Sequence, residues 1–116
     1  MRLTALLTLA IFCPAAAAEE TAVDVDYVSQ IKSIFKQRCY ACHGSLKQNA
    51  GLRLDTGQLI RKGSENGAIV QATAPGKSLL LKRVMHEDAD QRMPPIGMPL
   101  SDEEIRVIRQ WIAAGR

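Results

Sequence analysis

Apolar residues recur at helical spacing in three stretches of the sequence, and no stretch shows the alternation that a β-strand would produce. The first stretch, residues 27–35, carries one apolar face and runs into a cysteine at position 39. The second follows Ser78, a favoured residue type at a helix N-cap, and continues to His86. The apolar positions of these two predicted helices are Val28, Ile31, Ile34 and Phe35, and then Leu80, Leu81, Val84 and Met85.

The third stretch predicts the most strongly marked helix. Ser101 is followed three positions later by Glu104, which is the pattern of a capping box at a helix N-terminus. Leu100 before it can form a hydrophobic staple with the helix, and Gly115 is a suitable residue to end it. The predicted buried stripe of this helix consists of Ile105, Ile108, Trp111 and Ile112.

The intervening segments are polar and contain glycine or proline. A short helix is expected from Thr56 to Arg61, ended by Gly63, and residues 64–76 are expected to form a loop in which 68–70 can pack inward. Residues 86–99 form a second predicted loop with three prolines. The pattern therefore predicts an all-helical fold in which the first and last helices pack on one another.

The first 18 residues differ from the rest and read as a cleaved signal peptide. Arg2 precedes an apolar run, and the small residues 15–18 precede two glutamates. A membrane anchor is the competing interpretation, but this run is shorter than the roughly 20 residues that a spanning helix needs. Lipidation at Cys13 is disfavoured by bulky Phe12 before it. We therefore expect one exported domain, residues 19–116, in the periplasm or otherwise outside the cytoplasm, with no stable membrane insertion.

Composition narrows the possible functions of this domain. The full chain of 116 residues has a formal net charge of +3, and the 98 residues after the signal keep 14 basic and 12 acidic residues. This balance does not favour nucleic-acid binding. A domain of this size has a modest core and is commonly stabilised by disulfides, a metal or a cofactor. Only Cys39 and Cys42 remain after the signal, so no disulfide framework is available.

These two cysteines belong to the motif Cys39-Tyr40-Ala41-Cys42-His43. Cys-x-x-Cys-His is the signature of covalent c-type haem attachment, in which two thiols bind the porphyrin and the histidine is an iron ligand. A thiol-redox motif would need only the cysteines, within a βαβ context that this chain lacks. A structural zinc site would need a second ligand pair, which His86 alone cannot supply. We therefore expect one covalently attached haem c with its iron.

The sixth position of a haem iron with one histidine ligand is still to be filled, and a methionine sulfur is a common occupant. Met93 stands among polar residues directly before two prolines, where an apolar side chain has no local packing reason. His86 and Met98 are the alternatives, whereas Met85 falls on the apolar face of its predicted helix. The basic residues considered for the haem propionates or a partner's acidic surface are Lys47, Arg53, Arg61 and Arg92.

The order of several motifs resembles the planctomycete-type cytochrome c domain, a small class I cytochrome c-like fold of about three to five helices. The residues that carry the resemblance are CYACHG at 39–44, GLRLDT at 51–56, KSLLLKRV at 77–84, RMPP at 92–95 and PLSDEEIRVIRQWIAAG at 99–115. The resemblance implies covalent haem through Cys39 and Cys42, with His43 as proximal and Met93 as distal ligand.

With both axial positions filled, the expected function is single-electron transfer between redox partners rather than catalysis. In the family the domain commonly opens a longer exported protein, so this chain is expected either to carry electrons alone or to serve a separately encoded catalytic subunit. Contacts with redox partners are expected to be small and transient, and a monomer is expected. The alternative is a haem sensor or catalyst with a labile sixth ligand.

Overall fold

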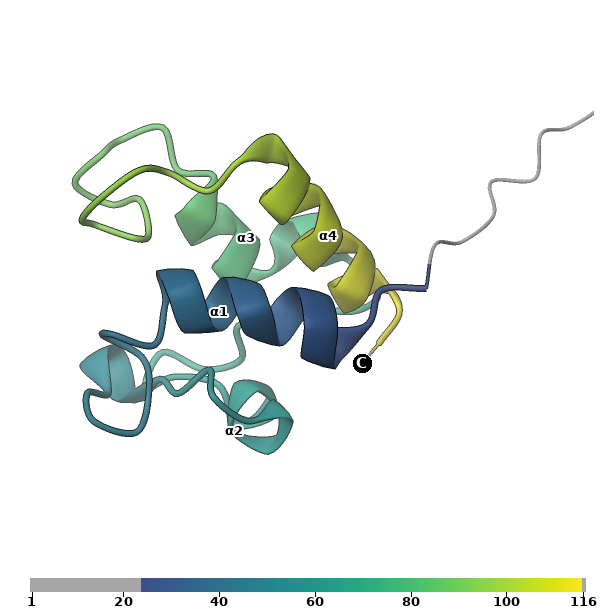
Figure 1. Ribbon diagram of the computed structural model, residues 1–116, viewed down its shortest axis with the longest axis horizontal. Coiled ribbons are helices and arrows are strands. Elements are labelled where there is room, and N and C mark those ends of the chain that lie inside the picture. The colour runs from purple at the N-terminus through teal and green to yellow at the C-terminus, as the bar shows by residue number, and fades with distance from the viewer. Residues whose placement is uncertain (1–23, 116) are drawn as a thin grey trace, which may run out of the picture.

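The computed structural model describes residues 24–115, which form four α-helices and, within that range, no β-strand (Figure 1). The helices are α1 (Lys32–Arg38), α2 (Gly57–Lys62), α3 (Leu79–Val84) and α4 (Asp102–Ala113). Three shorter helical segments accompany them: the π-helical η1 (Tyr27–Ile31) and the 3₁₀ turns η2 (Asn49–Gly51) and η3 (Pro75–Lys77). The predicted all-helical fold is confirmed.

The first predicted helix is present, but its first turn is wider than an α-helical turn. The backbone N–H of Lys32 bonds the carbonyl of Tyr27, five residues earlier, and α1 follows directly. Ile31 and Phe35 are fully buried, whereas Val28 is 71% exposed. The prediction that Val28 lies on the buried face is therefore wrong, because a π-turn advances the chain by more residues than the α-helical spacing assumes.

The last predicted helix has the N-terminus that its sequence indicates. Ser101 Oγ accepts the backbone N–H of Glu104 at 3.1 Å, and Glu104 Oε2 accepts the N–H of Ser101 at 2.8 Å. Gly115, with φ of +73°, follows the C-terminal end in the left-handed conformation that glycine adopts most readily. The buried face includes Val107, which was not predicted, while Ile105 is only partly buried.

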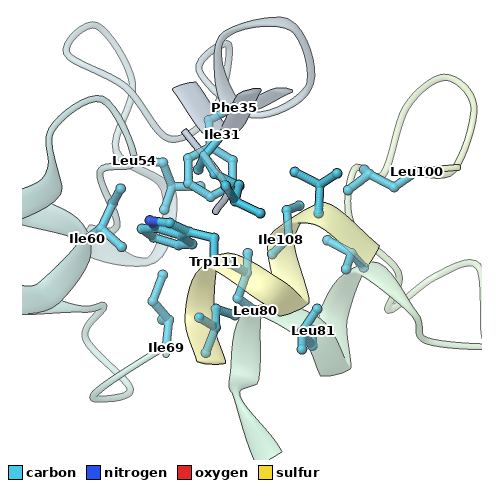
Figure 2. Packing of buried hydrophobic residues seen from close by; sticks show 14 residues of the cluster. Ile31, Phe35, Leu54, Ile60, Ile69, Leu80, Leu81, Leu100, Ile108 and Trp111 are labelled. Atoms are coloured by element: carbon cyan, nitrogen blue, oxygen red, sulfur yellow. The ribbon is translucent and has the colours of Figure 1, made fainter. Parts of the chain in front are cut away.

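The core forms where α4 packs on η1 and α3 (Figure 2). Trp111 lies at its centre and makes an edge-to-face contact with Phe35, with ring centroids 5.9 Å apart. Ile69, from the predicted inward part of the loop before α3, is buried as well. The packing of the first and last helices on one another is thus as predicted. The buried apolar set is Val25, Ile31, Phe35, Leu54, Ile60, Ile69, Leu80, Leu81, Val84, Leu100, Val107, Ile108, Trp111 and Ile112.

Helix α3 differs from its prediction at both ends. Ser78 occupies the N-cap position, but its buried hydroxyl accepts the backbone N–H of Gln71 at 2.9 Å and does not cap the helix. The helix ends at Val84, two residues before the predicted end. Met85 is 48% exposed, and its sulfur accepts a hydrogen bond from Arg109 on α4, so its predicted core role is wrong.

The predicted export and the predicted lack of membrane insertion concern different parts of the chain. The proposed signal peptide, residues 1–18, lies outside the described residues, and so does the start of the domain predicted at residue 19. Within residues 24–115 the longest helix has 12 residues, and none has both the length and the hydropathy that crossing a membrane requires.

Candidate functional site

A cavity of about 290 Å³ lies beside the C-terminal end of α1, close to the lower limit of ordinary ligand pockets. Figure 1 shows this end of α1 and the α3–α4 loop on the same side of the molecule. Cys39, Cys42 and His43 all line the cavity, together with Met93 from the α3–α4 loop. The apolar part of the lining consists of Ala41, Ala50, Leu52, Leu54, Ile69, Leu79, Leu80, Val84, Pro94 and Pro95.

A tight turn carries the motif from α1 into the cavity. The backbone N–H of His43 donates to the Cys39 carbonyl at 2.9 Å, and the N–H of Gly44 donates to the Lys47 carbonyl at 2.8 Å. Gly44 is buried, and a Cβ at this position would lie 2.6 Å from the Tyr40 carbonyl oxygen. Only glycine therefore fits this turn as it stands, and the turn fixes where His43 leaves the backbone.

The imidazole of His43 is oriented by one hydrogen bond. Its Nδ1 lies 3.0 Å from the carbonyl oxygen of Asn49. Because a carbonyl oxygen can only accept, Nδ1 carries the hydrogen and donates it, and in the neutral imidazole the lone pair is then on Nε2. Histidines that bind metals commonly make this contact through their other ring nitrogen, since it fixes the tautomer and the orientation of the ring. This contact therefore fits a role of His43 as an iron ligand through Nε2.

The candidates for the sixth ligand occupy different environments. Met93 is partly buried against the core, lines the cavity, and is fixed by its backbone N–H, which donates to the Arg83 carbonyl at 2.9 Å. Met98 is 75% exposed. The Nδ1 atom of His86 accepts the backbone N–H of Asp88. Neither of these two residues lines the cavity. Among these candidates, the structure brings only Met93 together with Cys39, Cys42 and His43.

Burial raises the pKa of the Cys39 thiol to about 12, and the nearby Arg38 guanidinium opposes this increase only in part. A thiol with this pKa is protonated at neutral pH, whereas thiol-redox motifs depend on a lowered pKa. Neither motif cysteine takes part in a disulfide bond. The described residues also contain no cluster of three or more His, Cys, Asp or Glu side chains that could hold a metal ion. The raised pKa of the Cys39 thiol therefore disfavours thiol-redox chemistry at this site.

The arginines at the cavity are not those considered from the sequence. Arg38 and Arg83 line it, whereas Lys47, Arg53, Arg61 and Arg92 do not. Arg53 instead pairs with Asp55 at 2.6 Å, and Arg92 donates to the His86 carbonyl at 3.4 Å. The sequence could have indicated Arg38 as a residue near the cavity, because it immediately precedes the first motif cysteine. The direction of its side chain could not be predicted from the sequence.

Comparisons with known proteins identify the family. A family model described as planctomycete cytochrome C matches residues 39–97, whereas no curated protein and no solved structure matches the chain. The matched segment begins at the first motif cysteine, includes Met93 and ends at Gly97, so the similarity noted over 99–115 lies outside it. Because the match spans half of the chain and contains the whole attachment motif, the chain belongs to the planctomycete cytochrome c family.

Proposed function

We propose that this protein is an exported monohaem c-type cytochrome that carries single electrons between redox partners. Cys39 and Cys42 would attach the porphyrin, and His43 and Met93 would be the axial ligands. The observation that carries the proposal is the joint presence of these four residues in one cavity, with Nδ1 of His43 engaged by the Asn49 carbonyl. Membership of a cytochrome c family implies covalently attached haem. When bound, that haem supplies a one-electron couple between ferrous and ferric iron.

The chain's own residues would orient this group and limit access to it. The Asn49 carbonyl holds the His43 ring, and the apolar part of the lining, which includes Leu52 and Leu80, would limit the access of water to the bound group. A thioether at the sixth position raises the reduction potential and leaves no vacancy for a substrate. For this reason we propose an electron-transfer protein rather than an enzyme.

The cellular setting is also proposed. Covalent haem attachment and the predicted signal at 1–18 are both consistent with export to the periplasm or a similar compartment. The protein would then meet its redox partners, or a separately encoded catalytic subunit, through small and short-lived contacts. We propose that it does so as a monomer.

Absorption spectroscopy and intact mass test the proposal on protein matured in a host that attaches haem c. The expected result is a polypeptide beginning near Glu19 with one added haem, and a sulfur-to-iron charge-transfer band in the ferric state. Colourless protein whose mass is explained by polypeptide alone would reject it.

Met93→Ala tests the sixth ligand, and Met98→Ala is its matched control because that side chain is exposed. We expect the band to disappear in the first variant and to persist in the second. The opposite result would transfer the ligand role to Met98. Carbon monoxide binding by the reduced wild-type protein under native conditions would instead favour the alternative, a haem sensor or catalyst with a labile sixth ligand.

A further inference from the structure

The side chain of Arg38 joins two parts of the site that are far apart in the sequence. Its Nη2 donates to the backbone carbonyls of Met98 at 2.8 Å and Pro99 at 2.7 Å. The backbone of Arg38 ends α1 and directly precedes Cys39, and its side chain is 24% exposed. One guanidinium therefore links the attachment side of the cavity to the far end of the α3–α4 loop.

The Met93 segment, defined as residues 93–99 of the α3–α4 loop, is held at both ends but weakly between them. At its near end, the backbone N–H of Met93 is bonded to the Arg83 carbonyl. Beyond Pro95, Ile96 is 86% exposed and a Cβ at Gly97 would meet no atom within 4 Å. Side-chain packing thus contributes little between Pro95 and the two carbonyls that Arg38 bonds.

Glu104 supports this arrangement from α4. Its Oε1 lies 3.6 Å from Arg38 Nε, while its other carboxylate oxygen completes the capping box with Ser101. The carboxylate is therefore anchored on the helix and attracts the guanidinium toward the start of α4 by charge alone, since Arg38 Nε makes no hydrogen bond within the described residues. This places the two loop carbonyls, the arginine and the glutamate in one connected cluster.

We infer that Arg38 is a positioning residue that keeps the Met93 segment closed over the cavity and so favours the sulfur-bound state of the iron. The inference rests on the proposed ligation by Met93. Loss of the two bonds would free the far end of the segment and increase the fraction of molecules in which the sulfur has left the sixth position. Hydrogen bonds from charged donors are among the stronger ones in proteins, so the change in this fraction should be measurable.

Imidazole binding to the ferric holoprotein measures that fraction, because imidazole can bind the iron only after the thioether leaves. When the open state is rare, the apparent affinity increases in proportion to its population. For Arg38→Gln we expect roughly a tenfold increase in apparent imidazole affinity and a loss of the charge-transfer band at lower temperature. Arg38→Lys keeps the charge and part of the hydrogen bonding, and we expect an intermediate affinity.

Arg106→Gln is the matched control. Arg106 is also an arginine paired with a glutamate, Glu103, but it lies on the exposed face of α4 and its hydrogen bonds join it to Glu103 and Gln110 of the same helix. We expect wild-type imidazole affinity in this variant. Denaturant unfolding of each variant shows whether a change in affinity merely follows a change in global stability.

The outcomes separate this inference from the proposed function. A wild-type protein without the charge-transfer band would refute ligation by Met93 and remove the basis for a role of Arg38. A wild-type protein with the band, together with unchanged imidazole affinity in Arg38→Gln and Arg38→Lys, would refute the role of Arg38 alone. If neither variant matures, hydrogen exchange of the Arg38 guanidinium in the wild-type holoprotein decides. Slow exchange supports the role of Arg38 in holding the Met93 segment, and exchange as fast as that of an exposed arginine overturns it.

Discussion

Gly44 provides the sharpest test of how the turn after the motif orients His43. A Cβ at this position would lie 2.6 Å from the Tyr40 carbonyl oxygen and 3.4 Å from the carbon of that carbonyl. The oxygen contact is about 0.8 Å shorter than the start of the ordinary contact range. Because the obstacle is backbone inside a hydrogen-bonded turn, Gly44→Ala can be accommodated only if the turn itself shifts.

The expected cost follows from two opposing effects. Overpacking of a well-packed region costs about 1–3 kcal/mol. Replacing glycine with alanine also reduces the freedom of the unfolded chain, which returns about 0.4–1 kcal/mol. We therefore expect Gly44→Ala to lower the free energy of unfolding by about 1.3 kcal/mol at the midpoints of these ranges, and by about 2.6 kcal/mol at most. A shifted turn would also move the His43 ring away from the Asn49 carbonyl.

Denaturant unfolding followed by far-ultraviolet circular dichroism measures this cost, with Gly76→Ala as the control. A Cβ at Gly76 would meet only the end of the Arg109 side chain, at an ordinary 3.5 Å. Because no overpacking opposes the unfolded-chain effect at this position, we expect the control to be more stable than the wild-type protein by about 0.4–1 kcal/mol. If Gly44→Ala is as stable as Gly76→Ala, the close approach of residue 44 to Tyr40 does not constrain the turn.

Three further predictions concern helix capping, the core and acid stability. Ser101→Ala removes the acceptor for a backbone N–H of α4 and should lower the free energy of unfolding by about 1 kcal/mol in denaturant titrations, whereas no change would show that the capping box is unimportant. Ile108→Ala removes a fully buried side chain and should cost about 2–5 kcal/mol in the same assay, and a cost below 1 kcal/mol would contradict the packing shown in Figure 2. The hydrogen-bonded Arg53 guanidinium lowers the pKa of the Asp55 carboxyl, so this pair stabilises the folded state fully above about pH 4 and progressively less as the pH falls through the lower folded-state pKa. Unfolding measured between about pH 5 and pH 2.5 should therefore depend less steeply on pH in Asp55→Asn than in the wild-type protein, and equal slopes would refute this assignment.

Local sequence determined those features whose interacting residues lie only a few positions apart in the chain. The capping box of Ser101 and Glu104 joins positions three apart, so the start of α4 could be predicted from the sequence alone. The same holds for Gly63 and Gly115, which end helices at positive φ because glycine has no Cβ to oppose that conformation. The attachment motif is equally local, since five consecutive residues bring both thiols and the imidazole together.

Tertiary structure decided which faces and which side chains reach the cavity. The π-turn turned Val28 toward solvent, and α3 ended at Val84 and left Met85 half exposed beside Arg109, although both positions fit an apolar helical face. The sequence offered Met93, Met98 and His86 as alternatives, but only the path of the α3–α4 loop placed one of them beside the motif. Sequence spacing does not determine such choices, because they depend on contacts between segments that only the folded chain brings together.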